Sequence, residues 1–568
     1  MEPAVKESTP QRRERTLRII AQDPAIRRPD GRILTADVSV PAEDLLPGPR
    51  GYRVHVIDYD ASAGVLYRAP KPPNAADPYR DAGDEVLLGD PGFHCQNVYA
   101  IVMRTLARFE FALGRRIGWS FSSHQIQIAP HAFSDANAFY SREDQALVFG
   151  YFPGSKGTVF TCLSHDVVAH ETTHALIDGL RQRFNDPSSP DQAAFHEGFS
   201  DIAALLSVFS LPELVEALMD YGAPRRRGDR VAVSSVDISS LRRSALMGLA
   251  EQMGSEMAAL RGSALRRSVE LTPSDRYLRQ EEFMEPHRRG EILVSAVLNS
   301  FLAVWRNRIQ GLGEAAPGYY NRRRVAEEGA SAARHLLTMA IRALDYTPPA
   351  DLEFSDFLSA LLTADTEIQP DDSRFHYRPA LLSTFQSFGI RPTSKGPNGI
   401  WEPPEGRLAY GSTHFEAMQR DTDEVFRFLW ENRKALGLHS DAYTRVLSVR
   451  PCTRLAPDGF LLRETAAEYI QILNIRAAEL ARYGIRKPGR MPDSQTVKLF
   501  GGGALIFDEY GRLKFHVRNK VLNAGRQTRR LRYLWEYGFF DHGARARNHI
   551  SELHRRKVMG LPMETVEE

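Results

Sequence analysis

The sequence predicts an α+β protein, because strand-like and helix-like segments fall in different parts of the chain. Segments that alternate apolar and polar residues, as strands do, lie before residue 150 and again after residue 445. Between these regions, longer segments repeat apolar residues at the spacing of helices that bury one face. We therefore expect a first part that contains strands, a helical middle, and a smaller α+β unit at the end.

Length and composition limit the classes of protein to consider. The chain has 568 residues, enough for two or three domains, and its formal net charge of +2 argues against a protein that binds nucleic acid through overall charge. Its three cysteines, Cys95, Cys162 and Cys452, are too few and too scattered to predict a disulfide framework or a cysteine-based zinc site. An ordinary globular protein is expected.

The hydropathy pattern predicts neither a secretory signal nor a transmembrane segment. The first 20 residues carry charges without a following apolar run. The longest nearly apolar run, Ile292–Trp305, has 14 residues and is too short to span a bilayer. We expect a cytoplasmic protein by default, with non-standard export as the alternative.

Residues 1–80 are expected to hold a leader and a short β segment. The first 30 residues are charged and poor in apolar periodicity, so we interpret them as a loose leader. GYRVHVIDYD and GVLYRA predict two strands joined at residues 60–64. The segment Ala69–Gly83, rich in proline, small and charged residues, predicts a linker.

Residues 81–392 are predicted to form the main domain. A helix over Asn97–Leu113 precedes short strands at His124–Ile128 and Gln145–Phe149. The further predicted helices cover Ser164–Leu180, Ala193–Phe209, Ala245–Ala264, Glu291–Asn307, Arg324–Leu344, Glu353–Leu362 and Pro379–Phe388.

Residues 393–406 predict a second linker, and residues 407–568 predict a separate α+β domain of unassigned role. A helix over Glu416–Leu436 should precede its strands, and Gly501–Gly503 is interpreted as a tight connection between two of them. The predicted strands are Arg445–Arg450, Phe460–Arg463, Thr496–Phe500, Ala504–Asp508 and Leu513–Arg518. The basic region 512–557 is interpreted as a solvated face. If it binds a partner, we expect an acidic partner rather than nucleic acid.

The stretch Ser164–Leu180, SHDVVAHETTHALIDGL, is the one with the clearest chemical content. It predicts an amphipathic helix that Ser164 caps and Gly179 helps to end. His170 and His174 are one turn apart on the same face, so two imidazoles can bind one metal ion, while Glu171 projects beside them toward a bound water. The alternative is a buried helix whose histidines make ordinary hydrogen bonds.

A zinc site built on two histidines needs a third protein ligand and an open position. The metzincin pattern requires histidine six residues after the second histidine, where this chain has Leu180, and is excluded. Glu197 lies on the next predicted helix within an apolar stretch. Asp201, one turn further on the same face, can accept the outer N–H of a ligand histidine. For both carboxylates the alternative is solvent exposure.

These residues carry a resemblance to a known family. DVVAHETTH and FHEGFSDI, which begin at Asp166 and Phe195, resemble the active-site helix and the Asn-Glu-x-x-Ser-Asp segment of thermolysin-like and fungalysin-like metallopeptidases, the gluzincins. The resemblance spans roughly residues 83–390. It implies a two-lobed zincin with a β-rich N-terminal lobe and a helical C-terminal lobe, followed by a separate small α+β domain. It also implies one catalytic Zn²⁺ held by the two motif histidines and Glu197.

The same resemblance implies roles for residues outside the helix. Asn137 and the backbone of Ala138, in an edge strand, would hold an extended peptide by strand addition. His287, in the segment PHRRGEI, would stabilise the transition state, with Glu282 as its orienting carboxylate. Val167 would help to form an apolar pocket for the residue after the cleaved bond.

Several positions depart from the family pattern. His196 stands where these enzymes usually carry asparagine, and Phe184 where some carry an assisting tyrosine. Val208 replaces an acidic ligand of the paired calcium site, so calcium dependence is not predicted. The arginine that grips the substrate carbonyl has two candidate locations, Arg225–Arg230 and Arg242–Arg243.

Together these observations predict a zinc-dependent endopeptidase that acts on protein or peptide substrates, with Glu171 as general base toward a metal-activated water. The alternative is a metallopeptidase-like scaffold that serves as a non-catalytic binding or assembly module. An aminopeptidase is a third hypothesis; it is weaker because the Gly-x-Met-Glu-Asn signature is absent.

Overall fold

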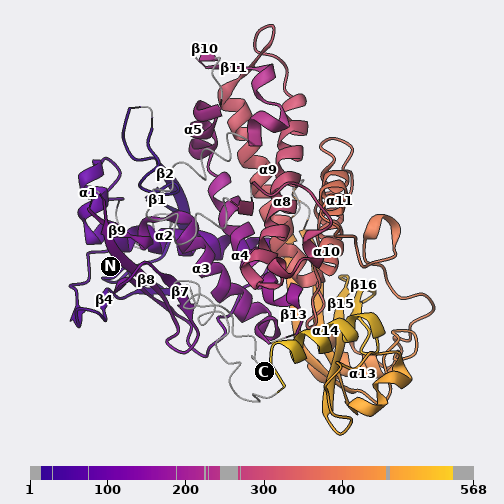
Figure 1. Cartoon of the computed structure of the whole chain (residues 1–568). Coiled ribbons are helices and arrows are strands. Elements are labelled where there is room, and N and C mark those ends of the chain that lie inside the picture. Colours follow the sequence, from indigo (N-terminus) through magenta and orange to yellow (C-terminus); the bar gives the residue numbers. More distant parts are fainter. Residues whose placement is uncertain are drawn as a thin grey trace, which may run out of the picture.

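The computed structural model describes residues 14–540, except 29, 74–75, 156, 187, 223–225, 228, 243–266, 269, 456–458 and 460. Figure 1 shows indigo strands on the left, purple to pink helices in the centre and an orange to yellow sheet at the lower right. Helices and strands thus lie in separate regions, which confirms the predicted α+β class.

The first described residues form a strand, so the prediction of a loose leader is wrong over this part. β1 (Glu14–Ile20) pairs antiparallel with β2 (Thr35–Pro41), with Leu17 opposite Val38. Leu17 and Ile19 are fully buried and alternate with polar neighbours. The period-two pattern is present in the sequence, but its apolar face is short. This face forms a stable strand only because it pairs with β2 and packs on the first long helix.

The N-terminal sheet has five strands in the order β3-β6-β8-β7, with β9 also paired to β8. β3–β6 and β6–β8 are parallel, and β7–β8 and β8–β9 are antiparallel, so β7 is an edge strand. The strands are β3 (Val54–Val56), β6 (Ile126–Ser134), β7 (Ala138–Ser141), β8 (Ala146–Gly154) and β9 (Gly157–Phe160). The predicted hairpin near residues 60–64 is confirmed as β4 (Tyr59–Asp60) with β5 (Val65–Leu66).

Helices fill the centre of the molecule, where α4 packs against both α3 and α8 (Figure 1). The predicted helices are confirmed there, apart from Ala245–Ala264, which lies outside the described residues. The helices are α1 (Asp84–Gly89), α2 (Pro91–Leu113), α3 (His165–Leu180), α4 (Pro190–Phe209), α5 (Pro212–Gly222), α8 (Pro286–Gln310), α9 (Arg322–Ala343), α10 (Phe354–Ile368) and α11 (Tyr377–Ser387). A small sheet joins β10 (Arg226–Arg227), β11 (Arg230–Ala232) and β12 (Tyr319–Asn321).

The helix α3 is buried on all sides rather than amphipathic, because every residue in it except Gly179 is buried. Its predicted caps hold only in part. Ser164 is the N-cap residue, but its hydroxyl donates to Asp23 instead of accepting from the helix, and the C-cap residue after Leu180 is Arg181 rather than Gly179. Gly179 instead allows close packing: a Cβ there would lie 2.2 Å from the carbonyl oxygen of Gly118.

The last part of the chain forms a four-stranded antiparallel sheet in the order β13-β14-β15-β16. Its strands are β13 (Tyr443–Leu455), β14 (Leu461–Arg476), β15 (Thr496–Phe507) and β16 (Leu513–Asn519), and its helices α12 (Phe415–Met418), α13 (Thr422–Glu431) and α14 (Ala524–Glu536). The interpretation of Gly501–Gly503 as a connection is wrong, because all three lie inside β15. Gly502 has φ +140°, and a Cβ there would lie 2.3 Å from the carbonyl oxygen of Tyr469.

One cluster of buried apolar side chains includes both the central helices and one face of this sheet. Cys452, Ile506 and Phe515 from the sheet belong to it, as does Trp401 from the predicted linker. The rest of the linker contains only one short 3₁₀ turn, Pro397–Gly399. The sheet is therefore packed directly onto the helical part of the molecule.

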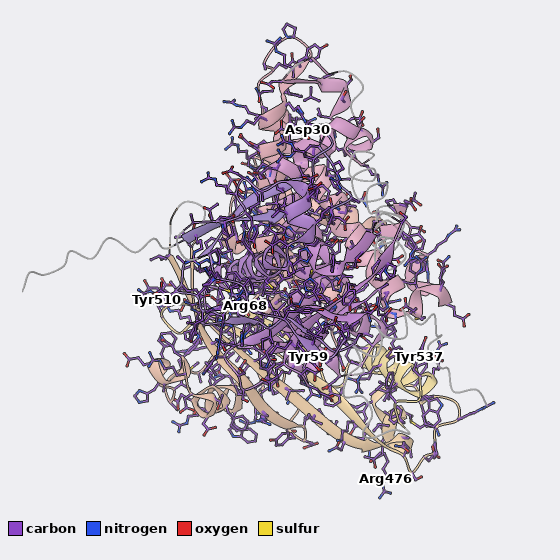
Figure 2. The ribbon with its side chains drawn as sticks, turned by 90° about the vertical axis from the view of Figure 1, so that its left-hand side faces the viewer. Asp30, Tyr59, Arg68, Arg476, Tyr510 and Tyr537 are labelled. Atoms are coloured by element: carbon purple, nitrogen blue, oxygen red, sulfur yellow. The ribbon has the colours of Figure 1, made fainter. Side chains whose placement is uncertain are left out.

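The molecular surface carries aromatic side chains at the ends of several elements. Figure 2 shows Tyr510 at the left side of the molecule and Arg476 at its lower end, and Tyr510, in the turn between β15 and β16, is 72% exposed. Among the described residues, no single helix has the length and apolar character to cross a membrane; only α4 together with residues 212–219 of α5, a pair bent by 81°, meets those two criteria.

Candidate metal centre

The two histidines of α3 face the same point in the interior. His170 and His174 are both buried, and their Nε2 atoms lie 2.8 Å apart. The four-residue spacing produces this arrangement, because side chains at i and i+4 stack on one face of a helix. The predicted pairing of these imidazoles is therefore present in the structure.

Glu197 from α4 completes a three-residue cluster. Its carboxylate oxygens lie 3.6 Å from the Nε2 atoms of His170 and of His174, and its side chain is buried. All three ligand atoms lie within 4.8 Å of one another. Solvent exposure, the alternative for this glutamate, is excluded.

The outer nitrogens of both histidines contact groups that can fix their orientation. Asp201 Oδ1 lies 2.7 Å from His170 Nδ1, as the sequence predicts. His196 Nδ1 and the hydroxyl of Ser200 lie 2.8 Å and 3.2 Å from His174 Nδ1. Burial lowers the pKa of His196 to about 4, so its ring is neutral and its Nδ1 can accept a hydrogen bond from His174 Nδ1. Sequence reasoning left the role of His196 open and missed Ser200, which follows it by one helical turn.

This proton arrangement fits a bound cation. With Nδ1 of each ring donating outward, the two inner Nε2 atoms present lone pairs to each other and to the carboxylate of Glu197. Two imidazoles and one carboxylate are ligands that zinc takes at catalytic sites, with a fourth position left for water. The residues present therefore fit Zn²⁺ by the chemistry of their donors.

Two glycines bring α8 against this cluster. A Cβ on Gly198 would lie 3.2 Å from Cα of Gly290, so α4 and α8 cross with their backbones in contact. The close crossing places His287, in the first turn of α8, beside the cluster, with its Nε2 3.5 Å from Glu197 Oε2. His287 is buried, so it is not a surface histidine.

Glu285, and not Glu282, orients His287. Glu285 Oε1 lies 2.7 Å from His287 Nδ1, whereas the exposed Glu282 pairs with Arg288. Glu285 is the N-cap of α8 and accepts the backbone N–H groups of residues 287 and 288, which turns its carboxylate back toward the ring. Burial raises the pKa of Glu285, but the hydrogen bond and charge of His287 and these backbone donors bring it down to about 2.

Glu171 lies between the cluster and the edge strand β7. It is fully buried, and its Oε2 accepts the backbone N–H of Tyr140 at 3.0 Å. Ala138 starts β7, and the half-buried Asn137 precedes it with its side-chain oxygen on the Ala138 N–H at 2.8 Å. The predicted edge strand is confirmed, and one oxygen of Glu171 is fixed by it. Val167, one turn before Glu171, is buried.

The remaining sequence-based candidates are less closely tied to the cluster. Phe184 packs edge-on against Phe195, and Val208 is buried. Both are apolar core residues, and neither has a hydroxyl or carboxylate to offer the site. Arg225 and Arg243 lie outside the described residues, and Arg242 donates to the Leu271 carbonyl. The substrate-gripping arginine therefore remains unassigned.

The C-terminal sheet contacts the end of α3, the helix that carries His170 and His174. Arg181, immediately after α3, forms an ion pair with Glu468 of β14. Arg450 from β13 pairs with the same carboxylate at 2.7 Å and donates to the Leu180 carbonyl at 3.3 Å. On the other side of the site, Tyr533 of α14 has a pKa raised by burial and, to a smaller extent, by the charge of Glu285.

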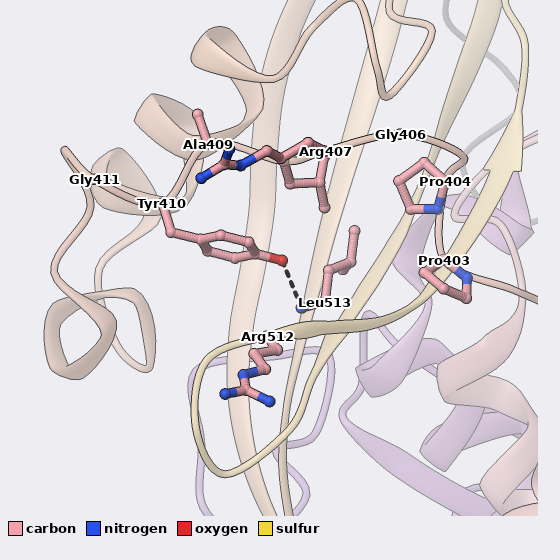
Figure 3. A pocket seen from close by; sticks show the side chains of 10 residues that line it. Pro403, Pro404, Gly406, Arg407, Ala409, Tyr410, Gly411, Arg512 and Leu513 are labelled. Carbon is pink, nitrogen blue, oxygen red and sulfur yellow. Dashed lines mark hydrogen bonds between the residues drawn. The ribbon is translucent and has the colours of Figure 1, made fainter.

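A separate open pocket lies at the edge of this sheet (Figure 3). Its wall combines the end of the predicted linker and the loop after it with the start of β16, and Tyr410 accepts the backbone N–H of Leu513 at 3.1 Å across it. Arg407 and Arg512 bring two guanidinium groups to it, and it shares no residue with the metal-ligand cluster.

Side chains from three helices converge at the centre. Two imidazoles and the carboxylate of Glu171, which is hydrogen-bonded to the edge strand β7, come from α3, a second carboxylate comes from α4, and a third histidine comes from α8. Neither the comparison with models of known protein families nor the search of curated proteins finds a match to this chain.

Proposed function

We propose that the protein is a zinc-dependent endopeptidase with a thermolysin-like, two-lobed zincin fold, in which His170, His174 and Glu197 bind the ion. The observation that carries this proposal is the convergence of three buried ligands beside Glu171, at the edge of a sheet. An edge strand can align a substrate backbone by strand addition, which suits an extended peptide. Asn137 and Ala138 are the substrate-binding residues in this proposal.

When bound, Zn²⁺ supplies Lewis acidity, which lowers the pKa of a water and polarises a peptide carbonyl. Glu171 acts as the general base: its carboxylate accepts a proton from the attacking water and then delivers it to the leaving amine. The hydrogen bond from the Tyr140 N–H holds one carboxylate oxygen in place during both transfers. Because the residue is fully buried, bulk water does not compete for the proton.

His287 stabilises the oxyanion that forms at the carbonyl. Its Nε2 lies 3.5 Å from Glu197 Oε2, and its Nδ1 contacts the carboxylate of Glu285. A protonated imidazole can donate from Nε2 to the developing negative charge. Asp201 fixes the tautomer of His170 and is a positioning residue.

The experiment that tests the proposal follows casein cleavage by the purified full chain. Dialysis against 1,10-phenanthroline should remove the metal and abolish cleavage, and added Zn²⁺ should restore it. His174→Ala should lower the zinc content by one equivalent per chain and remove cleavage, because the loss of one of three ligands weakens the site strongly. Cleavage that survives metal removal would contradict the proposal, and a folded, zinc-loaded but inactive wild type would favour the non-catalytic scaffold.

The contact between Glu285 and His287 predicts a second kinetic effect. Glu285→Gln keeps an oxygen that can cap α8 but removes the negative charge that contacts His287 Nδ1, so we expect kcat to fall about 10-fold with little change in KM. Glu282→Gln is the matched control, since its carboxylate pairs with Arg288 on the surface, and its kcat should stay within about twofold of wild type.

A further inference from the structure

We infer that His94, His131 and Cys162 form a second metal site, which takes a borderline-soft divalent cation such as Zn²⁺. His94 lies in the first turn of α2, His131 on β6, and Cys162 in the 3₁₀ turn Thr161–Leu163 that leads directly into α3. All three are buried, and their ligand atoms lie within 4.8 Å of one another. None of them belongs to the proposed catalytic site.

The hydrogen bonds of the two histidines leave their inner nitrogens as lone pairs. His94 Nε2 lies 3.0 Å from the Leu88 carbonyl oxygen, which can only accept, so Nε2 carries the proton of a neutral ring. His131 Nδ1 lies 2.9 Å and 3.1 Å from the two carboxylate oxygens of Asp58, so Nδ1 carries its proton. The remaining nitrogens, His94 Nδ1 and His131 Nε2, face each other at 2.8 Å.

Two lone pairs at that distance repel unless a cation lies between or beside them. In a tetrahedral zinc site with Zn–N bonds of about 2.0–2.1 Å, two ligand nitrogens are roughly 3.3 Å apart. The two nitrogens lie 2.8 Å apart, so the two rings need to move apart only slightly to reach the distance of a zinc site. Cys162 directs a sulfur toward the same point, and thiolate and imidazole are ligands that zinc binds together.

The two centres of the molecule share one construction. In each, a pair of histidines brings nitrogens to 2.8 Å, and a carboxylate holds the outer nitrogen of one ring, Asp201 for His170 and Asp58 for His131. A carboxylate behind a ligand histidine fixes its tautomer and raises its basicity toward a metal. The third ligand differs, a glutamate in one centre and a cysteine in the other.

The surroundings indicate a structural role for the second site. The centroid of the Phe160 ring lies 4.8 Å from that of His94 and 5.1 Å from that of His131, and this ring helps to exclude water. The site joins α2, a strand of the N-terminal sheet and the turn that opens α3. A bound cation would therefore fix the start of the catalytic helix against that sheet.

The competing explanation is a shared proton. A protonated His131, paired with Asp58, could donate from Nε2 to His94 Nδ1 without any metal. That explanation accounts for the two rings, but it assigns no function to the thiol that faces them. Metal binding accounts for all three side chains.

The test uses Co²⁺ as the probe in the purified full chain, because cobalt bound to a thiolate shows a charge-transfer absorption in the near ultraviolet. The catalytic centre has no sulfur ligand, so this band reports the second site alone. We expect the band in wild type and in His174→Ala, its loss in Cys162→Ser, and its retention in Cys452→Ser, a buried cysteine outside the cluster. With Zn²⁺, wild type should hold two equivalents, and Cys162→Ser and His174→Ala one each.

The outcome separates this inference from the proposed function. Absence of the band in folded, cobalt-loaded wild type would overturn the second site, and needs no variant that could fail to fold. Zinc content unchanged in Cys162→Ser would also overturn it and leave the shared proton as the explanation. If His174→Ala retains both equivalents while the band is present, the proposed catalytic centre fails and the second site stands.

Discussion

Glu171→Gln is expected to lower kcat for casein or peptide hydrolysis by about 10³-fold while the zinc content stays unchanged. Glutamine has the shape of glutamate, and its amide oxygen can still accept the Tyr140 N–H. It cannot take a proton from water or return one to the amine, so the loss falls on the chemical step. The measurement is steady-state kinetics on a quenched peptide together with the zinc content of the same preparation.

The matched control is Glu143→Gln, an exposed carboxylate in the turn after β7, which should leave kcat and KM unchanged. Equal activity of Glu171→Gln and wild type would exclude Glu171 as the base. Zinc-loaded wild type with no hydrolysis of any unfolded protein would instead support a binding or assembly module. If wild type does hydrolyse casein, cleavage-site mapping across a proteome, with Glu171→Gln as background, would define the substrate.

Local periodicity was sufficient to predict the convergence of His170, His174 and Glu197. His170 and His174 share one helix, and Glu197 and Asp201 share the next, so the two i, i+4 spacings determine which side chains lie on the same face. The structure then has only to pack two helices against each other. The apolar residues between the two carboxylates implied this packing. The sequence alone therefore indicated the two histidines and Glu197 as neighbours, and Asp201 as the carboxylate that contacts a histidine.

Contacts that depend on turns or on close backbone approach were not predictable. Glu282 and Glu285 are equally plausible partners of His287 in the sequence, and only the N-cap geometry of α8 selects the second. Likewise, the approach of Gly198 to Gly290, which brings α8 to the cluster, has no local signal beyond two glycines in helical segments.

The proposed second metal site and the C-terminal sheet show the same limitation at longer range. His94, His131 and Cys162 come from three elements with no motif spacing, so the cysteine count gave no indication of this cluster, which only the tertiary structure assembles. Glycines inside β15 suggested a strand break, because their need for a small residue arises from other segments: Tyr469 of β14 lies against Gly502, and Val517 of β16 lies against Gly503. Such constraints act between segments that are distant in sequence.

Arg454→Ala is expected to reduce the free energy of unfolding by about 3–5 kcal/mol. The Arg454 side chain is buried between Asp345, which follows α9, and Glu464 of β14, and it pairs with both carboxylates. Its removal leaves buried negative charge at the junction between the helices and the C-terminal sheet. Arg115 still pairs with Asp345 at 2.6 Å, and Lys514 with Glu464 at 3.2 Å, which favours the lower end of the range.

The pH dependence provides a second measurement of the same network. Burial alone would raise the pKa of Asp345, but the charges of Arg115 and Arg454 lower it well below its usual value. A depressed folded-state pKa contributes stability that is complete above the unfolded value, near 4, and is lost as pH falls toward the folded value. Wild type should therefore lose stability below pH 4 more steeply than Arg454→Ala, in urea denaturation followed at several pH values.

Arg445→Ala is the control for the junction, because this exposed residue lies on the same strand, β13, and its loss should cost less than about 0.5 kcal/mol. If Arg454→Ala costs no more than this control, the shared apolar cluster, rather than the ion pairs, holds the sheet on the helices. If the larger loss is found, the charges at the junction maintain the sheet that supplies Glu468 to Arg181 at the end of α3. Hydrolysis should then decline together with the folded fraction of the sheet, which links the stability of the C-terminal sheet to the position of the metal-binding helix.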